Sequence, residues 1–292
     1  MRRILIIGAT GTVGRATISQ LLSANVSLRA LTRNPQAARL PAQVQLFQGD
    51  LTNVSSLDRA LAGVDAVFLV YTAPPSAAAS AIPYIAACVP QIVFLSSPHQ
   101  TPHPFFRQPN PLANLHAEIE RLMQSSGVEW TFLRPGMFAA NPLNWWAPTL
   151  RVDPNVAVIR WPYGEAPTAP IHEADIGAVG ARVLLEAGHS DKDYVLTGPE
   201  SLTQSQQVQI LGEVLGRPLR LQEISPAEAQ RELLPIIPAA GVSMLLNAWA
   251  AALGQPAYVT SAVAAITGTP ARSFRQWVAD HAAAFRSSLS QS

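Results

Sequence analysis

Three glycines near the start of the chain have the spacing of a phosphate-binding turn. They lie between an apolar run at 3–7 and a helix-like segment at 13–24, in the order GATGTVG from Gly8 to Gly14. Gly8 would let the chain turn sharply off a strand, Gly11 would leave room for a phosphate, and Gly14 would let the helix pack closely on the sheet. The spacing is G-x-x-G-x-x-G rather than G-x-G-x-x-G, so the interpretation depends on this strand–turn–helix context. The alternative is a turn that binds no ligand.

The residues between these glycines would supply the contacts to the ligand. Free N–H groups at the start of the helix, near Thr12 and Val13, would point at a nucleotide pyrophosphate, and Thr10 belongs to the same turn. The sequence therefore predicts a dinucleotide site beside its first strand.

The end of the second expected strand bears on which dinucleotide is bound. In NAD-binding folds an acidic residue at this place bonds the ribose 2′-hydroxyl. Here the strand ends Leu-Thr-Arg-Asn-Pro at 31–35, without a carboxylate, and Arg33 suits a 2′-phosphate instead. We therefore expect NADP(H) in preference to NAD(H), the alternative being that Arg33 is a solvated surface cation. Asp50 and Leu51, after the third strand, are expected to border the adenine.

Several motifs together resemble the NmrA-like family of atypical short-chain dehydrogenases/reductases. They are the glycine turn, the Leu-Thr-Arg-Asn-Pro turn, Gln48-Gly49-Asp50, His116-x-x-x-Glu120, and Ser126-Gly127 leading to Leu-Arg-Pro-Gly at 133–136. The resemblance covers most of the chain and is strongest over residues 1–140. It implies a Rossmann domain, a small C-terminal lobe and binding of NADP(H) or NAD(H). The family includes quinone, azo-dye and triphenylmethane reductases, isoflavone-reductase-like enzymes and redox-sensing regulators, so it indicates the cofactor more firmly than the activity.

The Tyr-x-x-x-Lys pair that most catalytic members of the wider superfamily use is absent. Lys192 is the only lysine, and the two matching positions on the expected helix hold Leu112 and His116. Leu112 has no proton to give. His116 could bond the ribose hydroxyls or act as a general acid with a pKa suited to neutral pH. The alternative is a polar residue that only supports the loop above it.

Strand ends supply the remaining site candidates. Ser96 and Ser97 end the fifth strand, where either hydroxyl could bond a carbonyl oxygen or could instead cap the strand. Tyr71 and Thr72, at the end of the fourth strand, are expected to line the cofactor channel. Pro135 and Gly136, after the sixth strand, are expected to border the nicotinamide amide.

Aromatic and histidine residues suggest a pocket rather than a metal site. Phe105-Phe106 and Trp145-Trp146 could form an aromatic pocket over the nicotinamide, with packing between lobes as the alternative for the tryptophans, and Met137-Phe138 could form its apolar wall. His99 and His103 are four residues apart, but prolines make a helix there unlikely and no nearby cysteine or carboxylate completes a ligand set. We expect no bound metal.

Alternating apolar and helix-like segments predict an α/β fold with a doubly wound, parallel Rossmann sheet. Expected strands lie at 3–8, 26–32, 44–48, 66–70, 91–96 and 130–134, and helices at 13–24, 55–62, 77–88 and 112–126. Later strands are expected at 156–160, 194–197 and 220–224, and helices at 144–150, 174–186 and 273–285. A further helix is expected to start within 201–204 and to end at about 215. We expect a dinucleotide-binding domain at 1–140 and a smaller α+β substrate-facing lobe at 141–292, with some segments of about 156–198 folding back onto the sheet.

Composition excludes several classes of function. A net charge of +1 gives no electrostatic signature of nucleic-acid binding, and 48% hydrophobic with 13% charged residues indicates a large core. The single Cys88 excludes an intramolecular disulfide and is expected to be buried. No secretory signal and no run of about 18 apolar residues is visible, so we expect a cytoplasmic protein without a membrane span.

Two functions of different classes fit these residues. The first is an NADPH-dependent reductase of a small apolar conjugated carbonyl, quinone-like or imine-like acceptor, in which Ser97 or Ser96 orients the acceptor and His116 positions the ribose or supplies a proton. The alternative is a non-catalytic redox sensor that holds NADP(H) and reports its state to a partner, suggested by the absent tyrosine and lysine. A cyclase or isomerase on the same fold is a third possibility, and a homodimer is compatible with the sequence.

Overall fold

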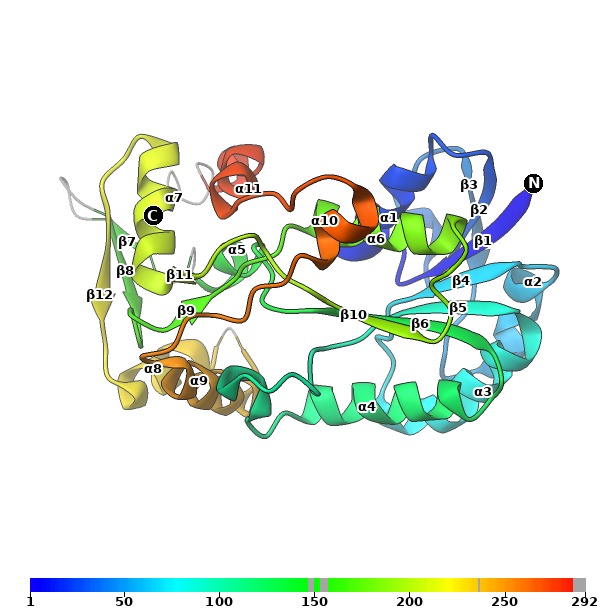
Figure 1. The fold of residues 1–292 in the computed structure, drawn as a ribbon, viewed down its shortest axis with the longest axis horizontal. Helices are drawn as coiled ribbons and strands as arrows, with labels where there is room; N and C mark the ends of the chain where they lie inside the picture. The colour runs from blue at the N-terminus through cyan, green and yellow to red at the C-terminus, as the bar shows by residue number, and fades with distance from the viewer. Residues whose placement is uncertain (147–149, 153–156, 236, 286–292) are drawn as a thin grey trace.

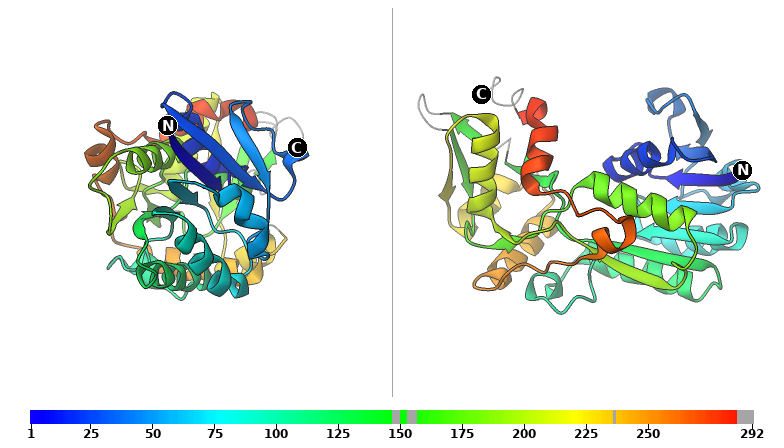
Figure 2. Two further views of the ribbon diagram at one scale, coloured as in Figure 1. Left: turned by 90° about the vertical axis from the view of Figure 1, so that its right-hand side faces the viewer. Right: turned by 45° about the horizontal axis from the view of Figure 1, so that its top comes forward.

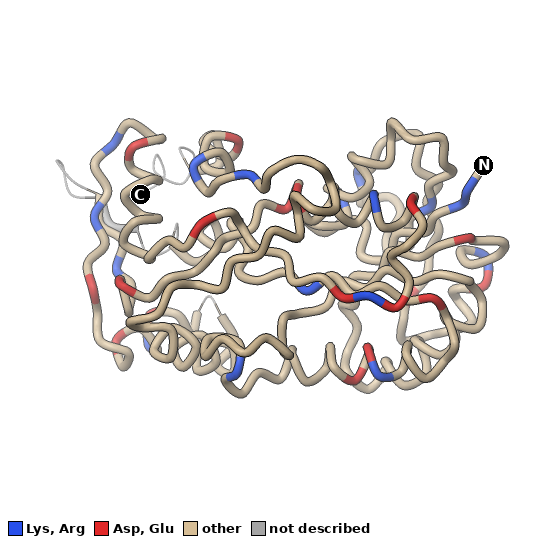
Figure 3. The backbone as a smooth tube through the Cα atoms, in the orientation of Figure 1, with Lys and Arg blue, Asp and Glu red and all other residues tan. Residues whose placement is uncertain are grey.

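The computed structural model describes residues 1–146, 150–152, 157–235 and 237–285. Two lobes lie along the long axis of the molecule, with the N-terminal strands in one and the last helix in the other (Figure 1, Figure 2). Basic and acidic residues are interspersed over both lobes (Figure 3). No helix of the described residues is long and apolar enough to cross a membrane.

The larger lobe is built on a seven-stranded sheet in which every pair of neighbours is parallel. Its spatial order is β10-β6-β5-β4-β1-β2-β3. The chain adds β2 and β3 on one side of β1 and the later strands on the other side, starting with β4. Doubly wound sheets bind dinucleotides at such a switch point, here between β1 and β4. Its strands are short and dense in β-branched and other apolar residues, because both faces of the sheet are covered. They are β1 (Arg2–Ile7), β2 (Val26–Thr32), β3 (Val44–Gln48), β4 (Ala66–Leu69), β5 (Gln91–Leu95), β6 (Glu129–Pro135) and β10 (Lys192–Leu196).

Helices cover both faces of this sheet (Figure 1). One face packs against α1 (Thr12–Leu21), α6 (Glu173–Leu185) and α10 (Ala262–Thr267). The other packs against α2 (Asp58–Leu61), α3 (Ala78–Cys88) and α4 (Pro111–Gln124). Close packing of α1 on α6 depends on Gly177, because a Cβ there would lie 2.6 Å from the Ala16 carbonyl carbon. Short 3₁₀ helices connect these elements at η1 (Pro35–Ala37), η2 (Val54–Leu57), η3 (Pro75–Ala77) and η4 (Pro104–Arg107).

The smaller lobe has its own core, which contains the fully buried tryptophans Trp161, Trp249 and Trp277. Its sheet has the order β12-β8-β7, and β9 pairs with β11 beside it. The strands are β7 (Leu150–Val152), β8 (Ala157–Trp161), β9 (Pro167–Thr168), β11 (Leu202–Thr203) and β12 (Leu219–Glu223). The helices are α5 (Asn141–Trp145), α7 (Gln204–Leu215), α8 (Pro226–Leu233), α9 (Ala239–Ala252) and α11 (Phe274–Asp280).

The six strands expected in the first 135 residues are present within about a residue of their predicted ends. Of the segment 156–198, which we expected to return in part to the main sheet, α6 and β10 lie on that sheet, whereas β8 joins the smaller one. The expected helix at 144–150 is wrong at its end, since Leu150 begins a strand, and residues 147–149 lie outside the described residues. Cys88 is exposed rather than buried, because α3 ends there and Val89 takes the next inward position.

Candidate functional site

The glycine turn connects β1 to α1 with almost no side-chain bulk. Gly8 has a φ of +81°, and a Cβ there would lie 2.7 Å from the Cβ of Val70. A Cβ on Gly14 would lie 2.3 Å from the Gly8 carbonyl oxygen. Gly11 differs from both, because its Cβ would meet only the Gly8 oxygen, at 3.4 Å. Protein packing therefore requires glycine at positions 8 and 14, and the free space at Gly11 is available to a ligand.

The first turn of α1 is left without a side-chain cap. Gly11 is the N-cap residue, it has no side chain to bond the helix N–H groups, and the first turn carries no acidic residue. Backbone N–H groups at an uncapped helix start attract anions. Thr12 is exposed beside this turn, whereas the Val13 side chain is buried in the core and offers a ligand only its backbone. These residues fit a dinucleotide pyrophosphate.

A polar hollow of about 460 Å³ opens next to this turn, at the ends of β1, β2 and β3. Six of the residues predicted to bind the cofactor line it together: Gly8, Thr10, Arg33, Asp50, Leu51 and Thr72. The guanidinium of Arg33 is exposed and makes no hydrogen bond or ion pair with any other residue in the described parts of the chain. It is therefore free to meet an anionic group of a ligand.

Asp50 is held as a carboxylate at the same hollow. Its Oδ1 accepts hydrogen bonds from the Thr52 backbone N–H at 2.9 Å and from the Thr52 hydroxyl at 2.8 Å. These bonds lower the pKa of Asp50, and the positive charge of Arg33 lowers it further. A carboxylate beside the hollow is able to accept a hydrogen bond from an adenine amino group.

A second hollow, of about 340 Å³ and largely apolar, lies at the ends of β4, β5 and β6. The two hollows adjoin at the end of β4, since Tyr71 lines one and the next residue, Thr72, lines the other. Pro135, Gly136, Met137 and Phe138 line the apolar hollow. That Pro135 and Gly136 border the nicotinamide amide stays a prediction. The Tyr71 hydroxyl donates to the Pro74 carbonyl at 2.8 Å, and burial raises the pKa of Tyr71.

His116 lies in the wall of the apolar hollow, on the first half of α4. Burial, helped by the nearby charge of His99, lowers the pKa of His116 to about 4. The side chain packs edge-on against Phe94, with ring centroids 5.4 Å apart, and its Nδ1 is buried and has no hydrogen-bond partner among the residues that the structure describes. A pKa this low leaves the imidazole neutral at pH 7, which argues against a general acid with a pKa suited to neutral pH. Binding of the ribose hydroxyls by its unpaired nitrogen stays a prediction.

The two serines after β5 have different surroundings. The Ser96 hydroxyl donates to Glu120 Oε1 at 2.6 Å, so its proton is already committed. Ser97 lines the apolar hollow, and its hydroxyl oxygen is buried without a hydrogen-bond partner among the described residues. Ser97 is therefore the better placed of the two to bond an acceptor.

Glu120 and Arg134 form a buried ion pair behind Ser96, which the sequence did not predict. Arg134 donates to Glu120 Oε1 through Nε at 2.9 Å and to Oε2 through an η nitrogen at 2.6 Å, and both side chains are about 95% buried. The other η nitrogen of Arg134 contacts Asp193 at 2.9 Å. His99 completes the group, with Nε2 3.5 Å from Glu120 Oε2. Glu120 and Arg134 both belong to the motifs that carry the family resemblance, and this is the sequence signal that could have identified the ion pair.

Aromatic residues close the apolar hollow from the side of the smaller lobe. Phe105 and Phe106 of η4 line it, as predicted, together with Met244, Leu245 and Ala248 of α9, which the sequence did not single out. Trp145 and Trp146 lie elsewhere. They pack against Trp161 and Trp249 in the core of the smaller lobe, so they take part neither in the aromatic pocket nor in the packing between lobes that was the alternative.

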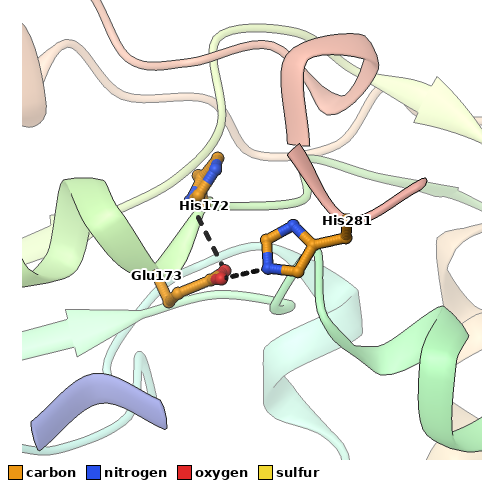
Figure 4. Close-up of side chains that lie close together, drawn as sticks. All are labelled: His172, Glu173 and His281. Carbon is orange, nitrogen blue, oxygen red and sulfur yellow. Dashed lines mark ion pairs between the residues drawn. The ribbon is translucent and has the colours of Figure 1, made fainter. Parts of the chain in front are cut away.

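One cluster of metal-ligand type occurs in the described residues, away from the hollows, at His172, Glu173 and His281 (Figure 4). The His172 Nδ1 accepts the Ala174 N–H at 3.0 Å, which caps α6, and the His281 Nδ1 donates to the Trp277 carbonyl at 2.8 Å. Glu173 lies between the two rings and contacts His281 Nε2 at 2.8 Å. These contacts join α6 of the larger lobe to the end of α11.

Comparisons with known proteins agree with this geometry. Residues 8–186 match the family model described as NAD(P)H-binding. The (4-alkanoyl-5-oxo-2,5-dihydrofuran-3-yl)methyl phosphate reductase of Streptomyces griseus subsp. griseus is 37% identical over 289 residues, 97% of this chain and 99% of that protein. The NAD(P)H azoreductase of Xenophilus azovorans is 32% identical over 291 residues, 97% of this chain and 99% of that protein.

Solved structures show the same relationship. An NADPH-dependent quinone oxidoreductase from Escherichia coli has 28% sequence identity and a TM-score of 0.79, and the match covers 95% of this chain and 98% of that one. The Citrobacter sp. triphenylmethane reductase complexed with NADP(H) shares the fold, with 21% identity, a TM-score of 0.76 and coverage of 96% and 99%. The chain belongs to the NAD(P)H-binding family of NmrA-like oxidoreductases with a Rossmann-type fold.

Proposed function

We propose that this protein is an NADPH-dependent reductase of a small, apolar, conjugated acceptor of the quinone, carbonyl or imine type. The observation that carries the proposal is the apolar hollow that adjoins the cofactor hollow at the end of β4. A dinucleotide whose pyrophosphate binds at the uncapped turn of α1 would place its adenosine in the polar hollow and its nicotinamide in the apolar hollow. The acceptor then shares the apolar hollow with the nicotinamide.

Arg33 supports NADPH as the preferred cofactor. Its free guanidinium lies in the cofactor hollow, and a planar cation with several donors suits a 2′-phosphate. Asp50, in the same hollow, follows β3 rather than β2, where an NAD-selective carboxylate is expected. The similar Escherichia coli quinone oxidoreductase has been solved as a complex with NADPH.

The lining of the apolar hollow supports the acceptor class. Leu95, Phe105, Phe106, Met137 and Met244 give it a largely apolar surface. When bound, the nicotinamide supplies a hydride, and a conjugated acceptor held dry and close needs little more than positioning to take it. The Ser97 hydroxyl would orient the acceptor by a hydrogen bond to its oxygen or nitrogen. The Escherichia coli and Xenophilus relatives are named for quinones and azo compounds, which belong to this class.

The proposed function is tested by mixing purified protein and NADPH with each member of a panel of quinones, azo dyes and enones, and by following the oxidation of NADPH. Oxidation of NADPH that depends on both the protein and an acceptor supports the proposal. Ser97→Ala is expected to raise the KM for the acceptor more than it lowers kcat, whereas Ser190→Ala, at an exposed loop, serves as a control. Tight NADPH binding without turnover over the whole panel would contradict a reductase and favour the redox sensor.

A further inference from the structure

Three side chains of metal-ligand type lie together where the end of α11 meets the start of α6 (Figure 4). His172 is the N-cap residue of α6 and Glu173 is its first residue, whereas His281 directly follows α11. Each of the three offers a nitrogen or oxygen atom within 4.8 Å of the corresponding atoms of the other two. Their side chains are 5%, 13% and 28% exposed in that order, so the cluster is largely buried and remains open to solvent at His281.

The hydrogen bond on the far side of the His281 ring directs a lone pair at Glu173. The His281 Nδ1 lies 2.8 Å from the Trp277 carbonyl oxygen, and a carbonyl only accepts, so Nδ1 carries a hydrogen. In the neutral ring the lone pair is then on Nε2, which lies 2.8 Å from Glu173 Oε1. Because both atoms present lone pairs, this contact needs a cation to be favourable, either a metal ion or a proton on Nε2.

His172 presents its other nitrogen to the same carboxylate. Its Nδ1 accepts the Ala174 N–H at 3.0 Å, so the hydrogen of the neutral ring is on Nε2, which lies 3.3 Å from Asp280 Oδ2. The Nδ1 also lies 3.4 Å from Glu173 Oε2. Lone pairs of His172 Nδ1, Glu173 and His281 Nε2 therefore meet at one place, with the carboxylate between the two rings (Figure 4).

The groups behind these three side chains have the arrangement that is found around metal ligands. A histidine that binds a metal nearly always donates its other N–H to a carboxylate or a backbone carbonyl, and a ligating carboxylate accepts a hydrogen bond in turn. Here His172 faces Asp280, and His281 bonds the Trp277 carbonyl. The indole N–H of Trp277 donates to Glu173 Oε2 at 2.9 Å. Each candidate ligand is thus oriented by a second group.

The charges near the cluster also favour a bound cation. Glu173 makes no ion pair with a lysine or arginine in the part of the chain that the structure describes, and Arg272 is paired with Asp175 instead. Asp280 adds a second carboxylate, which solvent screens in part because its side chain is 52% exposed. A divalent cation at the cluster would therefore be balanced by Glu173 and partly by Asp280.

We propose that His172, Glu173 and His281 bind one divalent transition-metal ion of the zinc type. Two imidazole nitrogens and one carboxylate suit Zn²⁺, whereas Mg²⁺ and Ca²⁺ prefer oxygen ligands alone. The metal would replace the Ala174 N–H at His172 Nδ1, and a water molecule would complete a tetrahedral site. The expectation of no bound metal considered only histidines that are close in sequence, whereas His281 reaches this cluster through the fold.

The position of the ion gives it a structural role. The helix α6 lies on the main sheet, and α11 packs in the core of the smaller lobe, so the metal would tie one lobe to the other. None of the three ligands lines either hollow, and the site is therefore independent of the proposed reductase function.

Metal binding is measured by isothermal titration calorimetry on the full chain, purified without an affinity tag and stripped with EDTA. We expect one Zn²⁺ per chain and no binding of Mg²⁺ at the same concentration. His281→Gln removes a ligand and should weaken Zn²⁺ binding about 100-fold or more, whereas Asp280→Ala removes only the partner of His172 and should weaken it about tenfold. Because Asp280 is half exposed, the second variant tests the site even if the first does not fold.

Two controls and a stability measurement locate the bound metal. His103→Gln and Cys88→Ser remove side chains that could bind Zn²⁺ elsewhere, and neither should change its affinity. Zn²⁺ should raise the Tm of the wild type and of both controls, and it should leave the Tm of His281→Gln unchanged. Wild-type protein that binds no Zn²⁺ would overturn the proposal and leave a protonated His281 paired with Glu173. Binding that is unchanged in both His281→Gln and Asp280→Ala, or that is lost in a control, would place the metal elsewhere and overturn it equally.

Discussion

Gly11→Ala separates ligand binding from folding more cleanly than any other change at the glycine turn. The residue has a φ of −80° and a ψ of 171°, which alanine adopts without strain, and the added Cβ would lie 3.4 Å from the Gly8 oxygen. Alanine is a poorer N-cap than glycine, but it also reduces the entropy of the unfolded chain, and the two effects are of similar size and opposite sign. We therefore expect the free energy of unfolding to change by less than about 1 kcal/mol.

The same methyl group would occupy the space that a bound pyrophosphate approaches. Forcing a methyl group into a filled contact costs about 1–3 kcal/mol, which corresponds to roughly a 5- to 150-fold loss of NADPH affinity. The assay is a fluorescence titration with NADPH beside urea denaturation of the free protein. Gly14→Ala is the matched control: its Cβ would lie 2.3 Å from a backbone oxygen, so it should lower the free energy of unfolding by about 1–3 kcal/mol. Unchanged NADPH affinity in Gly11→Ala would refute a pyrophosphate at this turn.

Three further predictions follow from the charges and burial of named residues. Arg33→Ala should weaken NADPH binding about 10- to 100-fold and leave NADH binding nearly unchanged in the same titration, whereas equal losses would exclude a 2′-phosphate contact. Glu120→Gln leaves Arg134 buried without its charge partner and should lower the free energy of unfolding by about 3–5 kcal/mol in urea, whereas Glu118→Gln, in an exposed pair with Arg121, should change it little. The folded-state pKa of His116, about 4, lies below its unfolded value of 6.5. The free energy of unfolding should therefore fall by roughly 3 kcal/mol as the pH drops from 6.5 to 4. In His116→Asn this part of the pH dependence of unfolding should disappear, and a wild-type curve flat over that range would contradict a neutral, buried His116.

The sequence predicted the elements of the main sheet well because its local signals are strong. Each strand is a short run of β-branched and other apolar residues followed by a polar turn, and the glycine turn marks β1 and α1. The smaller lobe was harder. Leu150 was placed on a helix, and the tryptophans at 145–146 were considered for the pocket, because an apolar residue looks the same in sequence whether it faces a core or a ligand.

The sequence predicted several residues that line the polar hollow, but it did not predict the contacts around the apolar hollow. Gly8, Arg33 and Asp50 belong to a turn or strand end with a known role, and the structure brings them to one hollow. The low pKa of His116 was not predictable, because its burial depends on packing against Phe94 of a distant strand. The group of His99, Glu120 and Arg134 comes from three elements that only the order of strands in the sheet brings together.

The most direct test of the account is a fluorescence titration with NADPH and NADH, followed by addition of menadione to the preferred complex. The account predicts tighter binding of NADPH than of NADH, and oxidation of the bound cofactor when menadione is added. Failure to bind either nucleotide would contradict the dinucleotide site itself. Tight binding with no oxidation by menadione or by the other acceptors of the panel would contradict the proposed reductase.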